Sequence, residues 1–520
     1  MKRRGSRDAD RDQATRPTAR RRWPASKVPP LLRERAFRRY WSGQTISMFG
    51  DQISSIVLPL VAVLTLHVGP AQMGYLVALQ WLPSLLFGLH AGAWVDRHGH
   101  RRAIMITADL GRAALLGSIP VCYALGVLTL AQLYGVAFGA GALSILFTVS
   151  DPTLFVALVP ADRYVEGQSL VYGSRALSFV GGPSAGGLLV QLLTAPFAVV
   201  ADALSFLGSA FFLSRIRPAE PPPQAADQGA LTAGARFIRH SSIVRASLTA
   251  VATVNFFTLM FFALFVLYAT RSLHVRSGLL GLVLGAGAIG GVLGALVTRR
   301  LAARIGVGRA YTIGCVIYTA PLALVPLAAG TQPVILAMLF AAEFCSGFGV
   351  MILDISIGAI FAAVIPDQLR SRVSGAFQAV NYGTRPVGAA VGGILASVIG
   401  LRPTLWIAAA GGVSGVLWLL PSPLPRFRMP DDSAGDASPD TANNDDGDSP
   451  AGAGDEAAPV DARDPSDDRD VSGDRDDQAA PSRPGPALMA ARLASADGDR
   501  QARRARFRRG RGAWPGLRPG

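Results

Sequence analysis

The sequence predicts an all-α membrane protein in which twelve transmembrane helices form two six-helix bundles related by pseudo-symmetry. Half of the 520 residues are hydrophobic and only 16% are charged, and the apolar residues recur in runs of ~20, the length that crosses hydrocarbon. The arginines of the short connections fall almost entirely in alternate connections, which is typical of membrane proteins. Two motifs also recur at nearly equal offsets, which indicates a repeated set of six helices.

Twelve apolar runs are the expected spans. Each should be a helix, because lipid offers the backbone no hydrogen-bond partner. In chain order the spans cover residues 41–66, 72–94, 103–125, 128–150, 167–191, 195–215, 246–270, 277–298, 309–329, 333–356, 373–399 and 403–421.

The expected domain boundaries follow from these spans and from composition. We expect a basic cytoplasmic segment over 1–35, the two bundles over 36–216 and 246–422, a cytoplasmic linker over 217–245, and a cytoplasmic tail over 423–520. The first segment lacks an apolar core of signal-peptide length, so we expect no cleavage. The linker contains three consecutive prolines and no crossing run. The tail, rich in Asp, Gly, Ala, Pro and Arg, is expected to be disordered.

The placement of arginine predicts the orientation. The connections that alternate with the arginine-rich ones carry only Arg271, Arg276 and Arg402. Because basic connections face the cytoplasm, we expect both termini to be cytoplasmic in a multi-pass protein of the inner (cytoplasmic) membrane. The formal charge of +15 is then a topology signal. With no clustered aromatic or groove-reading motif, it predicts no nucleic-acid partner.

The two repeated motifs link the halves of the chain. Gly92-Ala-Trp-Val-Asp-Arg, between the second and third spans, recurs 202 residues later as Gly294-Ala-Leu-Val-Thr-Arg. Tyr172-Gly-Ser-Arg in the fifth span recurs 210 residues later as Tyr382-Gly-Thr-Arg in the eleventh. One such pair can arise by chance in apolar sequence, but two at nearly equal offsets indicate internal duplication.

The connection after the second span carries a longer motif. Gly92-Ala-Trp-Val-Asp96-Arg97-His-Gly99-His-Arg101-Arg102 resembles the loop signature of the major facilitator superfamily, apart from Trp94 and His100. The resemblance implies the major facilitator fold, with Gly92, Asp96, Arg97, Gly99, Arg101 and Arg102 as gating residues. In that family the aspartate caps the start of the eleventh span and the basic residues bridge helices in one access state. A carboxylate near a helix N-terminus gains about 0.3–1 kcal/mol. The alternative is that the arginines only orient the loop.

The fifth span carries a second motif, Gly182-Pro183-Ser-Ala-Gly186-Gly187. It is similar to the core of the motif that marks drug:proton antiporters, with Ser169 and Ser178 where further glycines are common. Proline bends a helix and small residues let another helix approach closely, so the segment would serve as a hinge or a tight seal. Ordinary small-residue packing is the alternative.

Further resemblance concerns one branch of the superfamily. The opening of the first span from Phe37 to Gln52, Ala108-Asp-Leu-Gly-Arg112 and Ala201-Asp-Ala-Leu-Ser205 resemble the macrolide-efflux and enterobactin-exporter branch. The resemblance covers most of the membrane region but not the tail, and it implies export.

Ionisable groups inside the spans are the candidate proton or substrate residues, because each costs about 2.5–3.5 kcal/mol or more in hydrocarbon. Burial favours the protonated form of a carboxyl group, and a nearby arginine favours the ionised form. Asp51 and Glu343 lie near the midplane, and Asp51 is the preferred proton carrier. The alternative is structural pairing, as for Asp109 and Arg112 at i,i+3. The full set of candidates is Asp51, Glu343, Asp109, Arg112, Arg175 and Arg385.

Together these features predict a secondary active transporter, not an enzyme, that exports small amphipathic molecules or drugs by proton antiport and alternating access. The expected partners are a small-molecule substrate and the lipid bilayer, and the expected state is a monomer. The energy source is the proton gradient, with no cofactor and no metal, since the three cysteines have no metal-ligand spacing. A dedicated exporter or flippase of a siderophore or lipid, and a membrane sensor that moves nothing, remain as alternatives.

Overall fold

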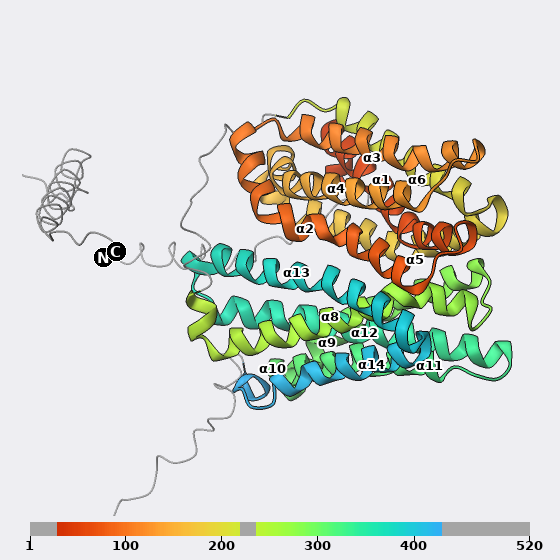
Figure 1. Ribbon diagram of the computed structural model, residues 1–520. Helices are drawn as coiled ribbons and strands as arrows, with labels where there is room; N and C mark the ends of the chain where they lie inside the picture. The colour runs from red at the N-terminus through yellow and green to blue at the C-terminus, as the bar shows by residue number, and fades with distance from the viewer. Residues whose placement is uncertain (1–28, 219–235, 429–520) are drawn as a thin grey trace, which may run out of the picture. The chain divides into compact units, whose positions relative to one another are not determined.

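The computed structural model describes residues 29–218 and 236–428, and within them every regular element is a helix (Figure 1). This confirms the predicted all-α class. Most of the expected N-terminal segment, the centre of the expected linker and nearly all of the expected tail lie outside the described residues. The described residues belong to one compact unit.

Six long helices make up the first half. They are α1 (Arg35–Leu60, continued by a π-helical turn Val61–Thr65), α2 (Pro70–His98), α3 (Arg101–Ala124), α4 (Leu130–Leu158), α5 (Tyr164–Leu193) and α6 (Ala195–Ser214). Short 3-10 turns Pro30–Arg33 and Ala161–Arg163 precede α1 and α5.

The second half repeats this order. It contains α8 (Ser242–Arg271), α9 (Ser277–Ile305), α10 (Val307–Thr319) with its extension through Ala320–Ala323 into α11 (Leu324–Leu327), α12 (Gln332–Val364), α13 (Asp367–Ile399) and α14 (Leu401–Ser414) with a 3-10 turn Gly415–Trp418. A last 3-10 turn covers Leu424–Arg426. Each of the twelve predicted ranges falls on one of these helices or on a helix with its extension.

Length and apolarity agree with the membrane prediction. Nine spans in the described residues are long and apolar enough to cross a bilayer, and a tenth is α2, whose segments Pro70–Gly88 and His90–His98 meet at 59°. Helices α13 and α14 are not among these spans. The regular part of α14 is only 14 residues long, and α13 contains Arg385, which lowers its mean hydropathy.

Several helices run four or more residues further than hydropathy predicted, and these longer extensions all lie at the same end of the bundle. For example, α4 ends at Leu158 instead of residue 150, and α13 begins at Asp367 instead of residue 373. The physical reason is that charged residues end a hydrophobic run without breaking the i→i−4 hydrogen bonds of a helix. We call this the basic end, because the helix ends there carry arginines such as Arg97, Arg101, Arg299 and Arg372.

Glycines terminate helices at both ends of the bundle. Gly99 closes α2 at φ 77°, and Gly306 and Gly400 separate consecutive helices at φ 87° and 95°. Glycine adopts these angles without the steric cost that a Cβ would add. The glycine at position 99 of the loop motif thus has a backbone role of its own.

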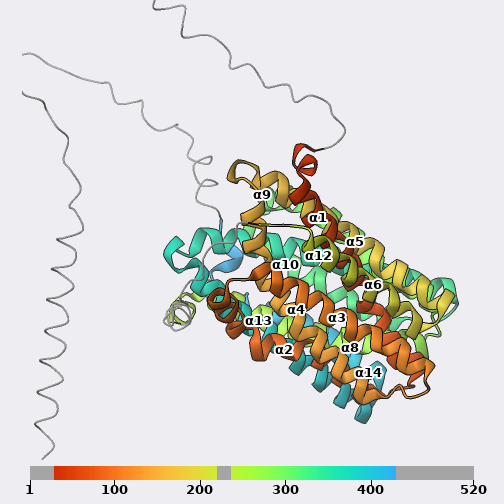
Figure 2. The ribbon, with the colours of Figure 1, turned by 90° about the horizontal axis from the view of Figure 1, so that it is seen from above.

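The two halves meet through two related helix pairs. One pair is α2 with α13 and the other is α5 with α9, and α2 and α13 lie side by side in both views (Figures 1 and 2). Helices α2 and α9 are the second span of their halves, and α5 and α13 are the fifth span of theirs. Each contact therefore joins the second span of one half to the fifth span of the other, so the two contacts are equivalent. This is the pseudo-symmetry that the repeated motifs predicted.

The apolar core is distributed unequally between the ends. At the end opposite the basic end, one continuous cluster of buried residues joins both halves, from Leu60 and Ile119 to Phe261 and Leu339. Towards the basic end the first half has its own cluster around Tyr40 and Phe155. The second half has separate clusters there. The halves therefore share a core at one end only.

Candidate functional site

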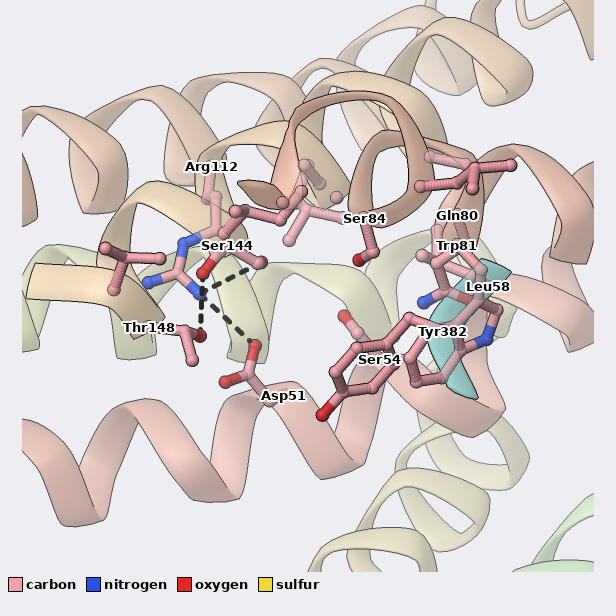
Figure 3. Close-up of a pocket in the computed structure, with 18 of the residues that line it drawn as sticks. Asp51, Ser54, Leu58, Gln80, Trp81, Ser84, Arg112, Ser144, Thr148 and Tyr382 are labelled. Carbon is pink, nitrogen blue, oxygen red and sulfur yellow. Dashed lines mark hydrogen bonds and ion pairs between the residues drawn. The ribbon is translucent and has the colours of Figure 1, made fainter. Parts of the chain in front are cut away.

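A cavity of about 530 Å³ lies between the halves in the middle of the bundle. Helices α1, α2, α3, α4 and α6 form most of its wall, and α13 closes it from the second half. Figure 3 shows polar groups gathered on one side of it and stacked aromatic rings on the other. The lining residues that bear on function are Asp51, Ser54, Gln80, Trp81, Arg112, Ser144, Asp202, Phe206 and Tyr382.

Arg112 is the centre of the polar side. Its side chain is only 2% exposed and is paired with the fully buried carboxylate of Asp109, one helical turn earlier. Its Nη1 lies 3.5 Å from Oδ1 of Asp51 on α1 and 3.4 Å from the hydroxyl of Ser144 on α4 (Figure 3). One guanidinium thus links helices α1, α3 and α4.

Two aromatic rings enclose the same guanidinium. The Arg112 Cζ lies 4.0 Å from the ring centroid of Phe206 and 4.7 Å from that of Phe147. Cation–π contacts of this kind contribute about 0.5–2 kcal/mol. Because the rings also exclude water, the charge of Arg112 acts on its carboxylate partners through a medium of low polarity.

Asp202 brings a third carboxyl group to this place. It is 1% exposed on α6, accepts a hydrogen bond from Ser205 at 3.0 Å, and is bonded by the hydroxyl of Ser54 on α1. It interacts electrostatically with both Asp51 and Arg112. We call Asp51, Asp109 and Asp202 with Arg112 the carboxylate cluster.

The charges in the carboxylate cluster do not balance when every acid is ionised. Three carboxylates against one guanidinium leave an excess of two negative charges at membrane depth. One oxygen of Asp109 is buried without a hydrogen-bond partner, as suits a carboxyl group that does not carry a full charge. The arrangement can therefore bind and release protons as a unit, since one acid gains a proton most easily when its neighbours are ionised.

A neighbouring acid was missed by the sequence reasoning. Asp151 of α4 accepts hydrogen bonds from the Tyr40 hydroxyl at 2.6 Å and from Gln44. Arg175 of α5, a predicted candidate, is exposed and attracts both Asp51 and Asp151 electrostatically. Asp151 lies just beyond the predicted span 128–150, so hydropathy placed it outside the membrane. Only the extension of α4 to Leu158 puts it inside the bundle.

The aromatic rings of the cavity wall contact the other arginine at membrane depth. Arg385 of α13 lies 4.6 Å from the ring of Trp81 on α2 and 4.9 Å from that of Tyr382, and these two rings are stacked 6.2 Å apart. Its Nε donates to Asn255 of α8 at 3.3 Å, and Asn255 donates to Asn381. Trp81 thus contacts Arg385 across the boundary between the halves.

We expect Trp81→Ala to destabilise the protein by more than an exposed tryptophan would. The cation–π contact alone accounts for about 0.5–2 kcal/mol, and the stacking with Tyr382 is lost as well. The measurement is the thermal unfolding midpoint of purified protein, with Trp418→Ala as the control because Trp418 is 53% exposed. Equal midpoints for the two variants would show that the contact contributes no stability.

The residues of the loop motif lie at the basic end, away from the cavity. Arg101 Nη2 lies 3.0 Å from Oδ1 of Asp96, and Arg102 donates to the main-chain oxygens of Leu213 and Ser214 at the end of α6. Arg102 thus bridges two helices. The family resemblance implied that Asp96 caps the eleventh span in one access state. In the described part of this conformation Asp96 is paired within its own loop, and the start of α13 has no side-chain cap.

The glycines of the fifth-span motif face two different helices. A Cβ on Gly182 or Gly186 would overlap Gln52 or Ile56 of α1. A Cβ on Gly187 would instead overlap the main chain of α9 at Ser277 and Gly281. The motif, with Pro183 inside α5, therefore lets α5 touch α1 within its own half and α9 in the other half.

Among the acids predicted as proton or substrate residues, Asp51 and Asp109 belong to the carboxylate cluster and Glu343 does not. It is 5% exposed on α12, in the second half, and it does not line the cavity. Gly92 and Arg97 also lie apart from the cavity, in the last two turns of α2.

The chain matches the family model described as Major Facilitator Superfamily, over residues 40–382 and again over 248–440. An uncharacterised MFS-type transporter, YfiS of Bacillus subtilis (strain 168), is 25% identical over 72% of this chain and 89% of its own length. The multidrug efflux pump Tap of Mycolicibacterium fortuitum is 28% identical over 68% of this chain and 88% of its own.

The fold has solved counterparts as well. A bacterial homologue of the iron transporter ferroportin, in an inward-facing state, superposes with a TM-score of 0.62 at 16% sequence identity, covering 76% of this chain and 99% of that chain. At this identity the likeness concerns the arrangement of helices alone.

Proposed function

Because the chain belongs to the major facilitator superfamily, we propose that it is a proton-coupled exporter of small amphipathic molecules, working by alternating access. The observation that carries this proposal is the cavity between the halves with a buried carboxylate cluster in its wall. An antiporter needs both features, since substrate and protons must compete for one site that faces one side of the membrane at a time. The relative Tap is a multidrug efflux pump, which supports export of drugs.

We assign the described conformation to the inward-facing state. The halves share an apolar core only at the end opposite the basic end, and the close approaches of α2 to α13 and of α5 to α9 lie on that side. The positive-inside rule puts the basic end in the cytoplasm. With that orientation both termini are cytoplasmic, and the cavity receives its substrate from inside the cell.

The cavity favours cationic or neutral amphipathic substrates. Phe206, Trp81 and Tyr382 provide apolar surface, and the side chain of Asp51, 47% exposed, can contact a substrate. A cation near Asp51 stabilises the ionised carboxylate cluster and so displaces a proton. The substrate and proton thereby exclude each other, which is the condition for exchange.

The alternative of a dedicated siderophore exporter would need the deep arginines to neutralise an anionic substrate. Arg112 is already paired with two carboxylates, and Arg385 makes cation–π contacts with two rings. The charge of Arg112 is thus compensated before a substrate arrives. Proteoliposomes distinguish the remaining alternatives from drug export. An exporter of a neutral lipid would move only that lipid, and a sensor would bind its ligand but move nothing.

The test is proton movement in everted membrane vesicles that contain the protein. Adding a cationic amphipathic dye should release part of the proton gradient in wild type, and Asp51→Asn should remove that response because the dye can then no longer displace a proton from position 51. Asp162→Asn, in the exposed turn before α5, is the matched control and should respond like wild type. A normal response in Asp51→Asn would remove Asp51 from the coupling site.

No enzymatic step is part of this proposal, and no cofactor or metal is required, since the proton gradient supplies the energy. We also propose that the protein acts as a monomer in the cell membrane. Each bundle of one chain completes the cavity with the other, so a second copy is not needed to form the site.

A further inference from the structure

The second half contains a buried acid that the cavity does not use. Glu343 of α12 is 5% exposed, and its Oε1 has no hydrogen-bond partner. In the described residues no ion pair reaches it. Glu343 is therefore both dry and without a counter-charge, unlike Asp51 with its arginine.

Glu343 lies where α9 and α12 pack closely against each other. A Cβ built on Gly287 of α9 would lie 3.4 Å from the Glu343 Oε2 and 3.2 Å from its main-chain oxygen. About one turn away on each helix, a Cβ on Gly290 or Gly347 would overlap the opposite backbone. The two helices thus approach backbone to backbone around this carboxyl group, and no side chain of α9 at this level offers it a charge.

The helices packed against α12 are α9, α10 and α11 with the turn before it, and they bring few charged or titratable groups near Glu343. Helix α9 carries Arg299, Arg300 and Arg304, all near the basic end and at least three turns from the level of Gly287. Helix α11 and the turn before it carry none. On α10 the groups are Arg309, Tyr311, Cys315 and Tyr318, and Tyr318 is the one that interacts electrostatically with Glu343. On α12 itself are Cys345 and Asp354.

An ionised carboxylate in this place would lack both water and a cation, and the cost of such a charge is several kcal/mol even after relaxation. A neutral carboxylic acid pays much less. We propose that Glu343 is a second proton-binding site, separate from the carboxylate cluster, and that it holds its proton in the conformation described here. The proposal rests on the proposed function only for what the proton does afterwards, namely exchange during the transport cycle.

Release of this proton requires a change at the α9–α12 contact. When the helices separate enough for water to reach Oε1, the O–H bond breaks, the proton passes to water and a carboxylate remains. The same change in packing is available when the halves rearrange, because α9 also contacts α5 of the first half. Each half would then contribute one protonation step, the first at the carboxylate cluster and the second at Glu343.

The direct test is infrared difference spectroscopy of the full-length protein in lipid vesicles during a pH titration. Wild type should show the carbonyl stretch of a protonated carboxyl group at pH values well above the ordinary glutamate pKa of about 4.3, and Glu343→Gln should lose that component. Asp51→Asn should keep it. Identical titrations of wild type and Glu343→Gln would overturn the proposal, whatever the transport assays show.

Glu343→Asp provides the second variant, because it keeps a carboxyl group if Glu343→Gln does not fold. It should retain a protonated carboxyl band, and absence of that band would contradict the proposal. In vesicles, the protons exchanged per substrate should fall in Glu343→Gln to about half of the wild-type number if the two sites each carry one proton. If the number of protons exchanged per substrate is unchanged in Glu343→Gln, Glu343 keeps its proton throughout the cycle, and its part in exchange is overturned. If Asp51→Asn responds normally, the proposed coupling site fails, while the infrared result still decides Glu343.

Discussion

Replacing Arg112 by alanine should abolish transport and destabilise the protein more than any other single substitution in the cavity. The change removes the only guanidinium in the carboxylate cluster and leaves Asp51, Asp109 and Asp202 facing one another at membrane depth. Breaking a buried ion pair on one side costs about 3–5 kcal/mol, and the cation–π contacts with Phe206 are lost in addition. The remaining acids would stay protonated and could not exchange protons with a substrate.

The measurement combines thermal unfolding of purified protein with substrate-driven proton movement in everted vesicles. Arg271→Ala, at the exposed end of α8, is the control for losing an arginine. Arg112→Lys keeps the charge but loses the planar fork and the ring stacking, so it should recover part of the stability and less of the transport. Asp109→Asn in the Arg112→Ala background should also recover stability, because fewer carboxyl groups then compete for protons. Wild-type behaviour of Arg112→Ala would show that the carboxylate cluster is not the coupling site.

The membrane fold could be predicted from the sequence because its signals are local or additive. Span length, arginine bias and repeated motifs each depend on short segments, and each of the twelve predicted ranges falls on a helix. The Asp109–Arg112 contact was also within reach, since i,i+3 spacing alone places the two side chains on one helix face. The errors lie at helix ends, where α4 and α13 continue past their apolar runs.

The composition of the site depended on information that a single helix does not carry. Counting residues along a helix gives only the depth of a residue in the membrane, and by this count Asp51 and Glu343 both lie near the midplane. The sequence did not show which neighbour each face of α12 contacts, because α12 is apolar on all sides and has no polar face to orient it. The structure separates the two acids: Asp51 faces the cavity and Glu343 faces α9.

Contacts between distant helices were the other limit. Asp202 stood out in the sequence only as part of the segment Ala201-Asp-Ala-Leu-Ser205, and its link to Ser54, which joins α6 to α1, is visible only in the structure. Trp81 was not selected at all, because its stacking on Tyr382 and Arg385 exists only when α2 meets α13. A signal was present in the repeat of Tyr172-Gly-Ser-Arg as Tyr382-Gly-Thr-Arg, which marks the helix of the second half that carries this contact.

Gly187→Leu should prevent the protein from closing at the end opposite the basic end, and it should abolish transport with little loss of helix content. A Cβ at this position already overlaps the main chain of α9 at Ser277 and lies 3.0 Å from the Gly281 Cα. Main-chain atoms of α9 cannot rotate away as a side chain can, so the overlap is relieved only if the whole helix moves outward. Overpacking of this kind costs about 1–3 kcal/mol or more. Only the conformation in which α5 and α9 touch suffers that cost, so the population shifts away from the inward-facing state.

The shift can be measured as access to the cavity from outside the cell. With Cys122, Cys315 and Cys345 replaced by serine, a cysteine introduced as Ala140→Cys in the cavity wall reports on a membrane-impermeant thiol reagent. Labelling should be faster in Gly187→Leu than in wild type. Gly173→Leu is the matched control on the same helix, because a Cβ there meets nothing within 4 Å. Equal labelling and intact transport in both leucine variants would mean that the α5–α9 contact does not seal the cavity, and the assignment of the inward-facing state would lose its main support.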